Sequence, residues 1–181
     1  MVENLRAAVV QDDQTGRVLM LGWMDDEALA LTRSSGLVHF FSRSRQRLWR
    51  KGESSGNVLH VSEVTADCDD DALLVSVHPE GPTCHEGSRS CFASPLWRRI
   101  LQREREGATD SYVVGQLAAG IAHNARKVGE EAVELVVAAL GESDDRVVSE
   151  AADLWFHVLL LLRARGLDPD AVYDELRARE R

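Results

Sequence analysis

The spacing of apolar residues changes after Phe92, and this change constrains the fold more than any other feature of the chain. Before Phe92, apolar residues gather in runs such as RAAVVQD and RVLMLGW, which have the length and composition of β-strands. After it, they recur every three or four residues over long stretches, which is the period of an amphipathic helix. The sequence therefore predicts two domains, a β-rich α+β domain at residues 1–92 and an all-helical domain at residues 93–181.

Local signals place the elements within each half. In the first half we expect a short helix in DDEALALTRSSG, with an acidic start and Gly36 as its stop, and further strands in LVHFFS, VLHVSEVTA and ALLVSVH. In the second half Ser94 is the expected N-cap of a helix with Pro95 in its first turn. Further helices are expected to stop at Gly141, to start at Ser143 or Asp144, and to start at Asp168-Pro169.

Composition and charge exclude several classes of protein. No run of about 18 apolar residues exists, so no membrane span is expected. The N-terminus lacks a basic segment followed by a long apolar one, so we expect no secretion signal and a cytoplasmic location. The net charge of −9 argues against non-specific nucleic-acid binding, which needs a basic face. An anionic small molecule is still compatible with this charge, because bound metal ions reverse the local sign.

The stretch DCDDD places four carboxylates around Cys68, and their mutual repulsion calls for a compensating cation. Thiolates suit zinc, whereas carboxylates suit magnesium or calcium. If the segment is extended, successive side chains alternate between two faces. We therefore expect Asp67, Asp69 and Asp71 on one side, and Cys68 with Asp70 on the other.

The other two cysteines, Cys84 and Cys91, lie in the loop TCHEGSRSC, which is of a kind that can wrap a metal. In a reducing cytoplasm, three cysteines are more often free thiols or metal ligands than disulfides. Three thiolates leave one tetrahedral position open, which is the pattern of a catalytic zinc with a bound water. His85 is then a fourth ligand or a proton-transfer group. The alternative is three buried free cysteines beside an acidic turn.

A basic stretch, SRSRQRLWRKGESSG at residues 42–56, reverses the charge of the chain locally. It holds Arg43, Arg45, Arg47, Arg50 and Lys51 with no acid before Glu53. Such cations beside Gly and Ser residues predict a phosphate-binding segment. The alternative is a solvated hairpin.

Acidic residues recur at helical spacing in KVGEEAVE and in SEAAD. Side chains three or four apart share one face of a helix, so two antiparallel helices would bring these carboxylates together. Carboxylates that hold magnesium together with substrate phosphates are a common arrangement. The apolar neighbours Val133, Val136, Val137, Leu154 and Trp155 are expected to pack the other faces. Helical Glu residues are otherwise usually solvated, and that is the alternative here.

Both sets of motifs resemble known families. Residues from about 8 to 92 resemble phosphoribosyl-AMP cyclohydrolase, and those from about 94 to 178 resemble phosphoribosyl-ATP pyrophosphohydrolase, a helical relative of the MazG-type pyrophosphatases. The matching stretches are QDDQTGRVLMLGWMDDEAL, SRSRQRLWRKGESSG, DCDDDALL and CHEGSRSCF in the first half, and SYVVGQLAAG, KVGEEAVE and SEAADLWFHVLLLL in the second. Their order is that of the fused bifunctional enzymes of histidine biosynthesis. Two small departures are Gly22, where Ala is usual, and Glu86, where Thr is often found.

The resemblance implies a role for each motif. In the cyclohydrolase family three cysteines bind zinc at a homodimer interface, one of them from the partner subunit. The implied zinc ligands are Cys68, Cys84 and Cys91, the implied proton-transfer group is His85, and the implied magnesium ligands of the first half are Asp67, Asp69 and Asp71. The implied magnesium ligands of the second half are Glu130, Glu131, Glu134, Glu150 and Asp153. The implied substrate-binding residues are Arg43, Arg45, Trp49, Lys51, Gly52, Ser54 and Lys127.

The resemblance also implies the order of two reactions. The helical domain would hydrolyse phosphoribosyl-ATP to phosphoribosyl-AMP and pyrophosphate, and the N-terminal domain would then open the adenine ring of phosphoribosyl-AMP. Two other readings of the motifs are a house-cleaning nucleotide pyrophosphatase with a structural zinc domain, and a non-enzymatic zinc module that mediates dimerisation.

Overall fold

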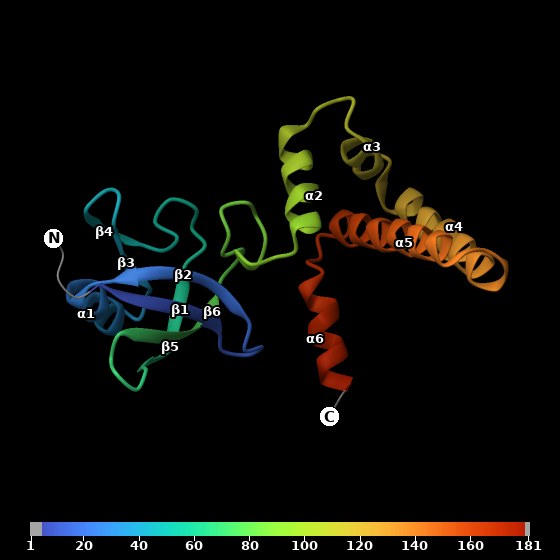
Figure 1. Ribbon diagram of the computed structural model, residues 1–181. Coiled ribbons are helices and arrows are strands. Elements are labelled where there is room, and N and C mark those ends of the chain that lie inside the picture. Colours follow the sequence, from blue (N-terminus) through green and yellow to red (C-terminus); the bar gives the residue numbers. More distant parts are fainter. Residues whose placement is uncertain (1–4, 180–181) are drawn as a thin grey trace. The chain divides into compact units, whose positions relative to one another are not determined.

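The structure is a computed structural model that describes residues 5–179. The chain divides into two compact units, and the boundary falls between Ala93 and Ser94. The first unit holds a β-sheet with one helix, whereas the second contains helices only within the described residues. The predicted fold class, a β-rich α+β unit followed by an all-helical one, is thus confirmed (Figure 1).

In the part of the N-terminal unit that the structure describes, residues 5–93, there are six strands and one helix. They are β1 Arg6–Asp12, β2 Val18–Met24, α1 Asp26–Ser35, β3 His39–Ser42, β4 Arg47–Arg50, β5 Leu59–Ala66 and β6 Ala72–Pro79. Four strands form one sheet in the order β2-β1-β6-β5, in which β1 and β6 are parallel and the other pairs are antiparallel. Strands β3 and β4 form a separate hairpin. The predicted strands and the helix ending at Gly36 are present, and β4 is an addition.

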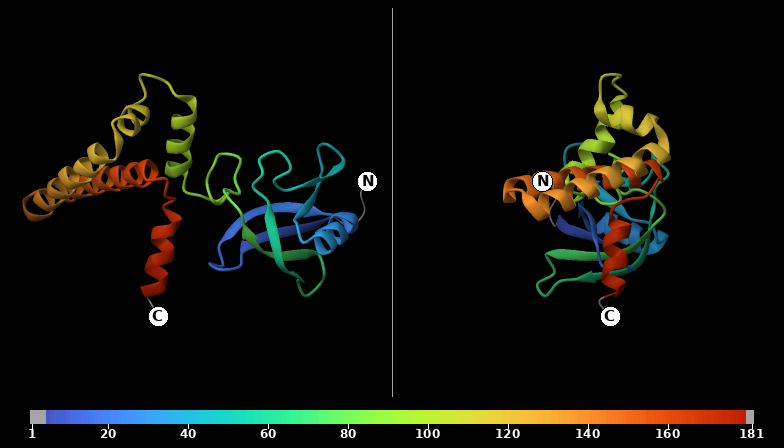
Figure 2. Two further views of the ribbon diagram at one scale, coloured as in Figure 1. Left: turned by 180° about the vertical axis from the view of Figure 1, so that it is seen from behind. Right: turned by 90° about the vertical axis from the view of Figure 1, so that its right-hand side faces the viewer.

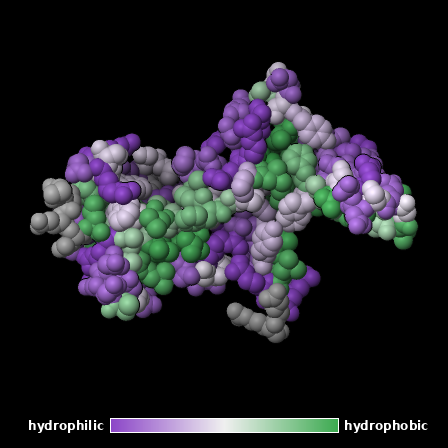
Figure 3. All heavy atoms as spheres, viewed as in Figure 1, coloured by the Kyte–Doolittle hydropathy of each residue, from purple (hydrophilic) through white to green (hydrophobic). Residues whose placement is uncertain are grey.

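The two faces of the four-stranded sheet differ. Ala8 and Val10 of β1 and Val75 of β6 point into the core, where Phe40 of β3 and residues of α1 cover them. On the opposite face, strand register places Val9 between Leu21 and Leu74. Leu21 and Leu74 are exposed, at 47% and 40%. Hydrophobic side chains are accordingly visible over this region in Figure 3.

Between Ser94 and Arg179, the described part of the C-terminal unit, there are five helices. They are α2 Pro95–Glu106, α3 Tyr112–Ala118, α4 Gly120–Gly141, α5 Asp144–Ala164 and α6 Asp170–Arg179. The hydroxyl of Ser94 accepts a hydrogen bond from the Trp97 amide at 3.2 Å, which confirms the predicted cap. Helices α4 and α5 lie side by side in every view (Figures 1 and 2). None of the helices in residues 5–179 is long and apolar enough to cross a membrane.

One packing prediction for this unit is wrong. Val133, Val136 and Val137 of α4 were expected to be covered, but they are 55–63% exposed, and Leu140 is 84% exposed. Their spacing of three and four residues forms a continuous apolar stripe on α4. The prediction fails because α5 and α3 cover only part of the surface of α4, so this stripe has no partner among the described residues of the chain.

Gly22 lies where the core leaves no room for a side chain. A Cβ atom at this position would lie 2.9 Å from Cζ of Phe40 and closer still to Cδ1 and Cε1. Phe40 is fully buried, so its ring cannot move aside freely. We therefore expect Gly22→Ala to lower the free energy of unfolding of the N-terminal unit by about 1–3 kcal/mol, the usual cost of overpacking.

Denaturant unfolding of the full chain would measure this effect. The double variant Gly22→Ala, Phe40→Leu should recover part of the loss, because leucine vacates the space that the ring occupies. Equal stability of Gly22→Ala and the wild-type protein would contradict this account of the position.

Candidate functional site

The loop that carries Cys84 and Cys91 is tied to strand β2. The Cys91 amide donates to the Leu19 carbonyl at 2.8 Å, and the Ser90 hydroxyl donates to the Val18 carbonyl at 2.8 Å. Within the loop, the Cys84 amide donates to the Ser88 carbonyl at 3.1 Å. These bonds fold the loop back on itself, so that both cysteines reach the same cavity.

That cavity has a volume of about 560 Å³ and combines thiols with cations and hydroxyls. Its lining includes Arg45, Trp49, Arg50, Lys51, Gly52, Ser54, Ser55, Asn57, Thr83, Cys84, His85 and Cys91. The predicted proton-transfer residue His85 and five of the predicted substrate-binding residues, Arg45, Trp49, Lys51, Gly52 and Ser54, therefore lie around the two cysteines. Arg50 and Ser55 also belong to the predicted phosphate-binding segment, whereas Asn57 and Thr83 are additions that no spacing signal in the sequence marks.

The two thiols of this cavity lie close to each other and to a buried lysine. The pKa of Cys91 is raised to about 11, mainly by burial and in part by the neighbouring Cys84 thiol, with which it forms a hydrogen bond. Lys51 is 9% exposed, and its burial lowers its pKa, which the nearby Cys91 and Cys84 partly offset. Two neighbouring thiols that line one cavity are soft donors of the kind that bind zinc.

Cys68 lies apart from this pair. It is exposed in the turn between β5 and β6 and does not line the cavity. Within residues 5–179, no group of three potential metal ligands with donor atoms within 4.8 Å of one another includes a cysteine. One chain thus brings together two of the three predicted zinc ligands.

The segment DCDDD is a turn and not an extended strand, so the predicted alternation of faces is wrong. Strands β5 and β6 pair up to Ala66 and Leu73, which forces the chain to reverse between them. Asp70 takes a left-handed conformation with φ of 65°, which Asp tolerates better than most residues. The Asp67 carboxylate accepts hydrogen bonds from the amides of Asp71 and Ala72, both at 3.1 Å, and closes the turn.

The turn nevertheless gathers the three predicted carboxylates. Ligand atoms of Asp67, Asp69 and Asp71 lie within 4.8 Å of one another, and all three residues are exposed. The hydrogen bond from the Ala72 amide lowers the pKa of Asp67, whereas the charges of Asp69 and Asp67 raise the pKa of Asp71. Mutual repulsion of this kind is relieved by a hard divalent cation, which carboxylate oxygens suit.

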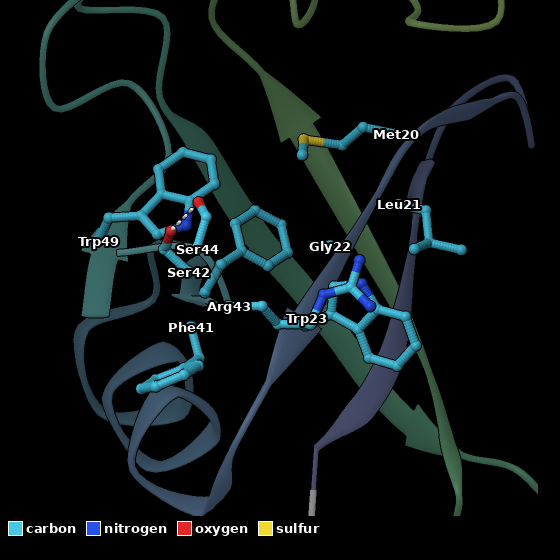
Figure 4. Close-up of a pocket in the computed structure, with 10 residues that line it drawn as sticks. Met20, Leu21, Gly22, Trp23, Phe41, Ser42, Arg43, Ser44 and Trp49 are labelled. Carbon is cyan, nitrogen blue, oxygen red and sulfur yellow. Dashed lines mark hydrogen bonds between the residues drawn. The ribbon is translucent and has the colours of Figure 1, made fainter. Parts of the chain in front are cut away.

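Arg43 does not line the cavity that holds Arg45, Lys51 and the two cysteines. Its guanidinium lies over the Trp23 ring, 4.3 Å from the centroid, in a second cavity of about 600 Å³ (Figure 4). Trp49 borders both cavities. The structure also explains Gly52, which has φ of 85° and whose Cβ would lie 2.6 Å from the backbone of Asn57. Only glycine fits there, so Gly52 shapes its loop whether or not it touches a ligand.

The helical unit gathers a second set of acids between α4 and α5. Glu131, Glu150 and Asp153 have carboxylate oxygens within 4.8 Å of one another, and the first two residues are buried. Glu130 and Glu134, which were also predicted as ligands, are not in this group. Glu130 pairs with Arg126 and Lys127, and Glu134 is exposed. Two buried carboxylates and one exposed carboxylate on facing helices fit a magnesium ion.

Two cations lie against these acids. Lys127 Nζ is 2.9 Å from Glu131 Oε1 and 3.1 Å from Glu130 Oε2, and its hydrogen bond to Glu131 is the main cause that raises its pKa. Arg146 pairs with Glu150 and, at 3.0 Å, with Glu142. The predicted phosphate ligand Lys127 is thus paired with carboxylates in the isolated chain.

Three polar residues at this site, His157, Tyr112 and Asn124, were not among the site residues predicted from the sequence. His157 is buried, with its Nε2 atom 3.6 Å from Glu131 Oε1 and 3.3 Å from the Tyr112 hydroxyl. Burial is the main cause that lowers the pKa of His157. Asn124 donates to the carbonyls of Gln116 and Gly120, at 2.7 and 2.8 Å, and joins α3 to α4. The only signal for His157 was its position four residues after Asp153 on one helix.

Comparison with known proteins bears on both units. The family signature of phosphoribosyl-AMP cyclohydrolase matches residues 20–93, and that of phosphoribosyl-ATP pyrophosphohydrolase matches residues 94–180. Among similar proteins is the histidine biosynthesis bifunctional protein HisIE of Xylella fastidiosa (strain Temecula1), 48% identical over 99% of this chain and 90% of its own length.

Two further proteins of the same name support the assignment. That of Xanthomonas axonopodis pv. citri is 51% identical over 91% of this chain and 84% of its own length. That of Escherichia coli (strain K12) is 44% identical over 98% of this chain and 92% of its own length. The chain belongs to the HisIE family of bifunctional histidine-biosynthesis enzymes, which are phosphoribosyl-AMP cyclohydrolases and phosphoribosyl-ATP pyrophosphohydrolases.

Proposed function

We propose that the two units divide the two activities and that each depends on its own metal ion. The N-terminal unit would open the adenine ring of phosphoribosyl-AMP with zinc, and the helical unit would release pyrophosphate from phosphoribosyl-ATP with magnesium. The observation that carries the proposal is the cavity in which Cys84, Cys91 and His85 meet Arg45, Lys51 and Ser54. It combines soft metal ligands, a group able to carry a proton and phosphate-binding side chains within about 560 Å³.

In the N-terminal unit, Cys84, Cys91 and a Cys68 would hold the zinc. Zinc in such a site lowers the pKa of a bound water to about 7 and so supplies hydroxide at neutral pH. The charge of the Lys51 ammonium acts against the rise in the pKa of Cys91. We assign proton transfer to the imidazole of His85, and phosphate binding to Arg45 together with the amides and hydroxyls of the Gly52–Ser54 segment. Asp67, Asp69 and Asp71 would hold magnesium.

In the helical unit, Glu131, Glu150 and Asp153 would hold magnesium against the triphosphate. Magnesium there supplies positive charge for the phosphoryl oxygens in the transition state. Lys127 and Arg146 already lie at the carboxylates, and we assign to phosphate binding the N–H groups that they do not use there. Glu130 and Glu134 lie outside the group of three and would act, at most, from its edge.

Supplying phosphoribosyl-ATP to the purified chain tests both activities together. We expect pyrophosphate and the ring-opened aminoimidazole carboxamide product to form, and ordinary nucleoside triphosphates to be hydrolysed far more slowly. Hydrolysis of all triphosphates at similar rates, with no ring-opened product, would instead indicate a general nucleotide pyrophosphatase.

Metal analysis tests the zinc assignment. Protein purified without chelator is expected to contain about one tightly held zinc per chain, because thiolates bind zinc far more tightly than carboxylates bind magnesium. Magnesium should be lost on gel filtration. Ring-opening activity in protein without zinc would contradict the assignment of the three cysteines.

We also propose that the chain works as a homodimer with shared zinc sites. Cys68 lies apart from Cys84 and Cys91, so a Cys68 from a second copy would complete the ligand set. Two exposed apolar surfaces support self-association. One is the row of Leu21, Val9 and Leu74 on the sheet, and the other is the stripe of Val133, Val136, Val137 and Leu140 on α4.

Light scattering is expected to give a mass of at least twice the 20.0 kDa of one chain. Val136→Asp places a charge in the stripe on α4 and should weaken association, whereas Arg105→Asp, at an exposed position of α2, should not. A monomer with full ring-opening activity would contradict the shared site.

A further inference from the structure

His157 lies next to the carboxylates of the helical unit, but it is not one of the proposed metal ligands. It is 4% exposed, and its Nε2 atom faces two oxygen atoms, Glu131 Oε1 at 3.6 Å and the Tyr112 hydroxyl at 3.3 Å. A distance of 3.6 Å is longer than a hydrogen bond, yet it leaves no room for a water between the two atoms. His157 and Glu131 therefore contact each other directly across the α4–α5 pair.

The surroundings of the ring select one tautomer. The Nδ1 atom of His157 is buried and has no hydrogen-bond partner among the described residues. A buried donor without a partner is costly. A carboxylate oxygen only accepts hydrogen bonds, so a proton on Nε2 is attracted to Glu131, whereas a lone pair there would be repelled. The arrangement thus favours an Nε2–H group directed at Glu131 and Tyr112.

The same carboxylate oxygen is held from a second side. Lys127 Nζ lies 2.9 Å from Glu131 Oε1, the atom that His157 faces. Because Oε1 lies between an ammonium and an imidazole, the Glu131 carboxylate cannot rotate freely. Its other oxygen, Oε2, is then left to bind the metal. Outer partners of this kind orient metal ligands, and their loss typically weakens metal binding by about 10- to 100-fold.

We propose that His157 is a positioning residue that orients Glu131 for magnesium in the helical site. The inference rests on the magnesium site proposed above. It assigns to the imidazole a role through Glu131, with no contact to substrate or metal. The competing explanation is structural, since His157 also contacts Tyr112 and could serve only to hold α3 against α5.

Three variants of the full chain separate these explanations. In His157→Gln the side-chain amide replaces Nε2, so a donor toward Glu131 is kept. In His157→Asn the shorter amide replaces Nδ1, so that donor is lost. Tyr112→Phe removes only the hydroxyl, and Tyr112 is exposed enough that folding is not at risk.

Binding of Mn²⁺, followed by the electron paramagnetic resonance of the free ion without substrate, is the primary measurement. Glu131→Gln serves as the baseline for ions bound elsewhere on the chain. We expect His157→Gln and Tyr112→Phe to bind within about threefold of wild type, and His157→Asn to bind at least about tenfold more weakly. The Mg²⁺ concentration that half-saturates pyrophosphate release should rise in parallel, while the KM for phosphoribosyl-ATP at saturating Mg²⁺ stays unchanged.

Wild-type affinity in a folded His157→Asn variant would overturn the inference, and so would equal weakening in the Gln and Asn variants or in Tyr112→Phe. Should His157→Asn fail to fold by circular dichroism, the other two variants still decide, because loss of Mn²⁺ binding in either contradicts the inference. If Glu131→Gln binds as many ions as wild type, the magnesium site itself is wrong, and that result is distinct from a failure of His157 alone.

Discussion

Cys84→Ser is expected to abolish ring opening while pyrophosphate release continues, so that phosphoribosyl-AMP accumulates. The substitution removes one of two sulfurs that lie in contact in the N-terminal cavity. A metal-bound water contributes several kcal/mol to such a hydrolysis, and about 4 kcal/mol corresponds to roughly a thousandfold in rate. We therefore expect ring opening to fall by about a thousandfold or more, as measured by formation of the ring-opened product from supplied phosphoribosyl-AMP.

The same preparation contains its own control. Pyrophosphate release depends on residues of the other compact unit, which folds around its own core, so it should stay within about twofold of wild type. Zinc content should fall together with ring opening. Full ring-opening activity in a zinc-depleted Cys84→Ser protein would remove the cysteines from the proposed site.

Asp153→Asn should have the converse effect. The substitution keeps the shape of the side chain but removes one negative charge from the group of Glu131, Glu150 and Asp153. Because Asp153 is exposed, the variant should fold normally. We expect pyrophosphate release from phosphoribosyl-ATP to fall by about a hundredfold, within the range of losses when a metal ligand or its support is changed, while supplied phosphoribosyl-AMP is still opened.

Asp145→Asn is the matched control for this variant. Asp145 is exposed in the first turn of the same helix and lies outside the group of three, so the same change of charge should leave both activities near wild type. If either Cys84→Ser or Asp153→Asn abolished both activities in a folded protein, the two sets of ligands would have to belong to one shared site.

Local chemistry made the elements of this chain predictable. The change of apolar period after Phe92 marks the fold class, because strands and helices bury residues at different intervals. Ser94 begins α2 through a hydroxyl cap, and Gly36 ends α1 through a left-handed backbone conformation. Both interactions involve only a few neighbouring residues. The meeting of Glu131 with Glu150 and Asp153 was predictable for a similar reason. A short connection makes α4 and α5 antiparallel neighbours, and helical spacing aligns their acids.

Contacts between distant segments were not predictable in this way. Pairing of β5 with β6 forces the segment DCDDD to form a turn, although its sequence alone is compatible with a strand. The hairpin of β3 and β4 carried Arg43 to Trp23 and away from Arg45, only two residues along the chain. His157 stood in the sequence as a histidine on a helix, and only the packing of α5 against α4 and α3 placed it at Glu131 and Tyr112.

The sequence by itself determined which side chains are available and on which kind of element each lies, because periodicity and caps act over a few residues. The tertiary structure decided which of them meet. Cys84 and Cys91 meet because their loop is tied to β2, whereas Cys68 stays apart because the β5–β6 turn carries it elsewhere. Strand register and helix packing depend on the burial of surfaces far apart in the chain, and no local pattern of residues encodes that choice.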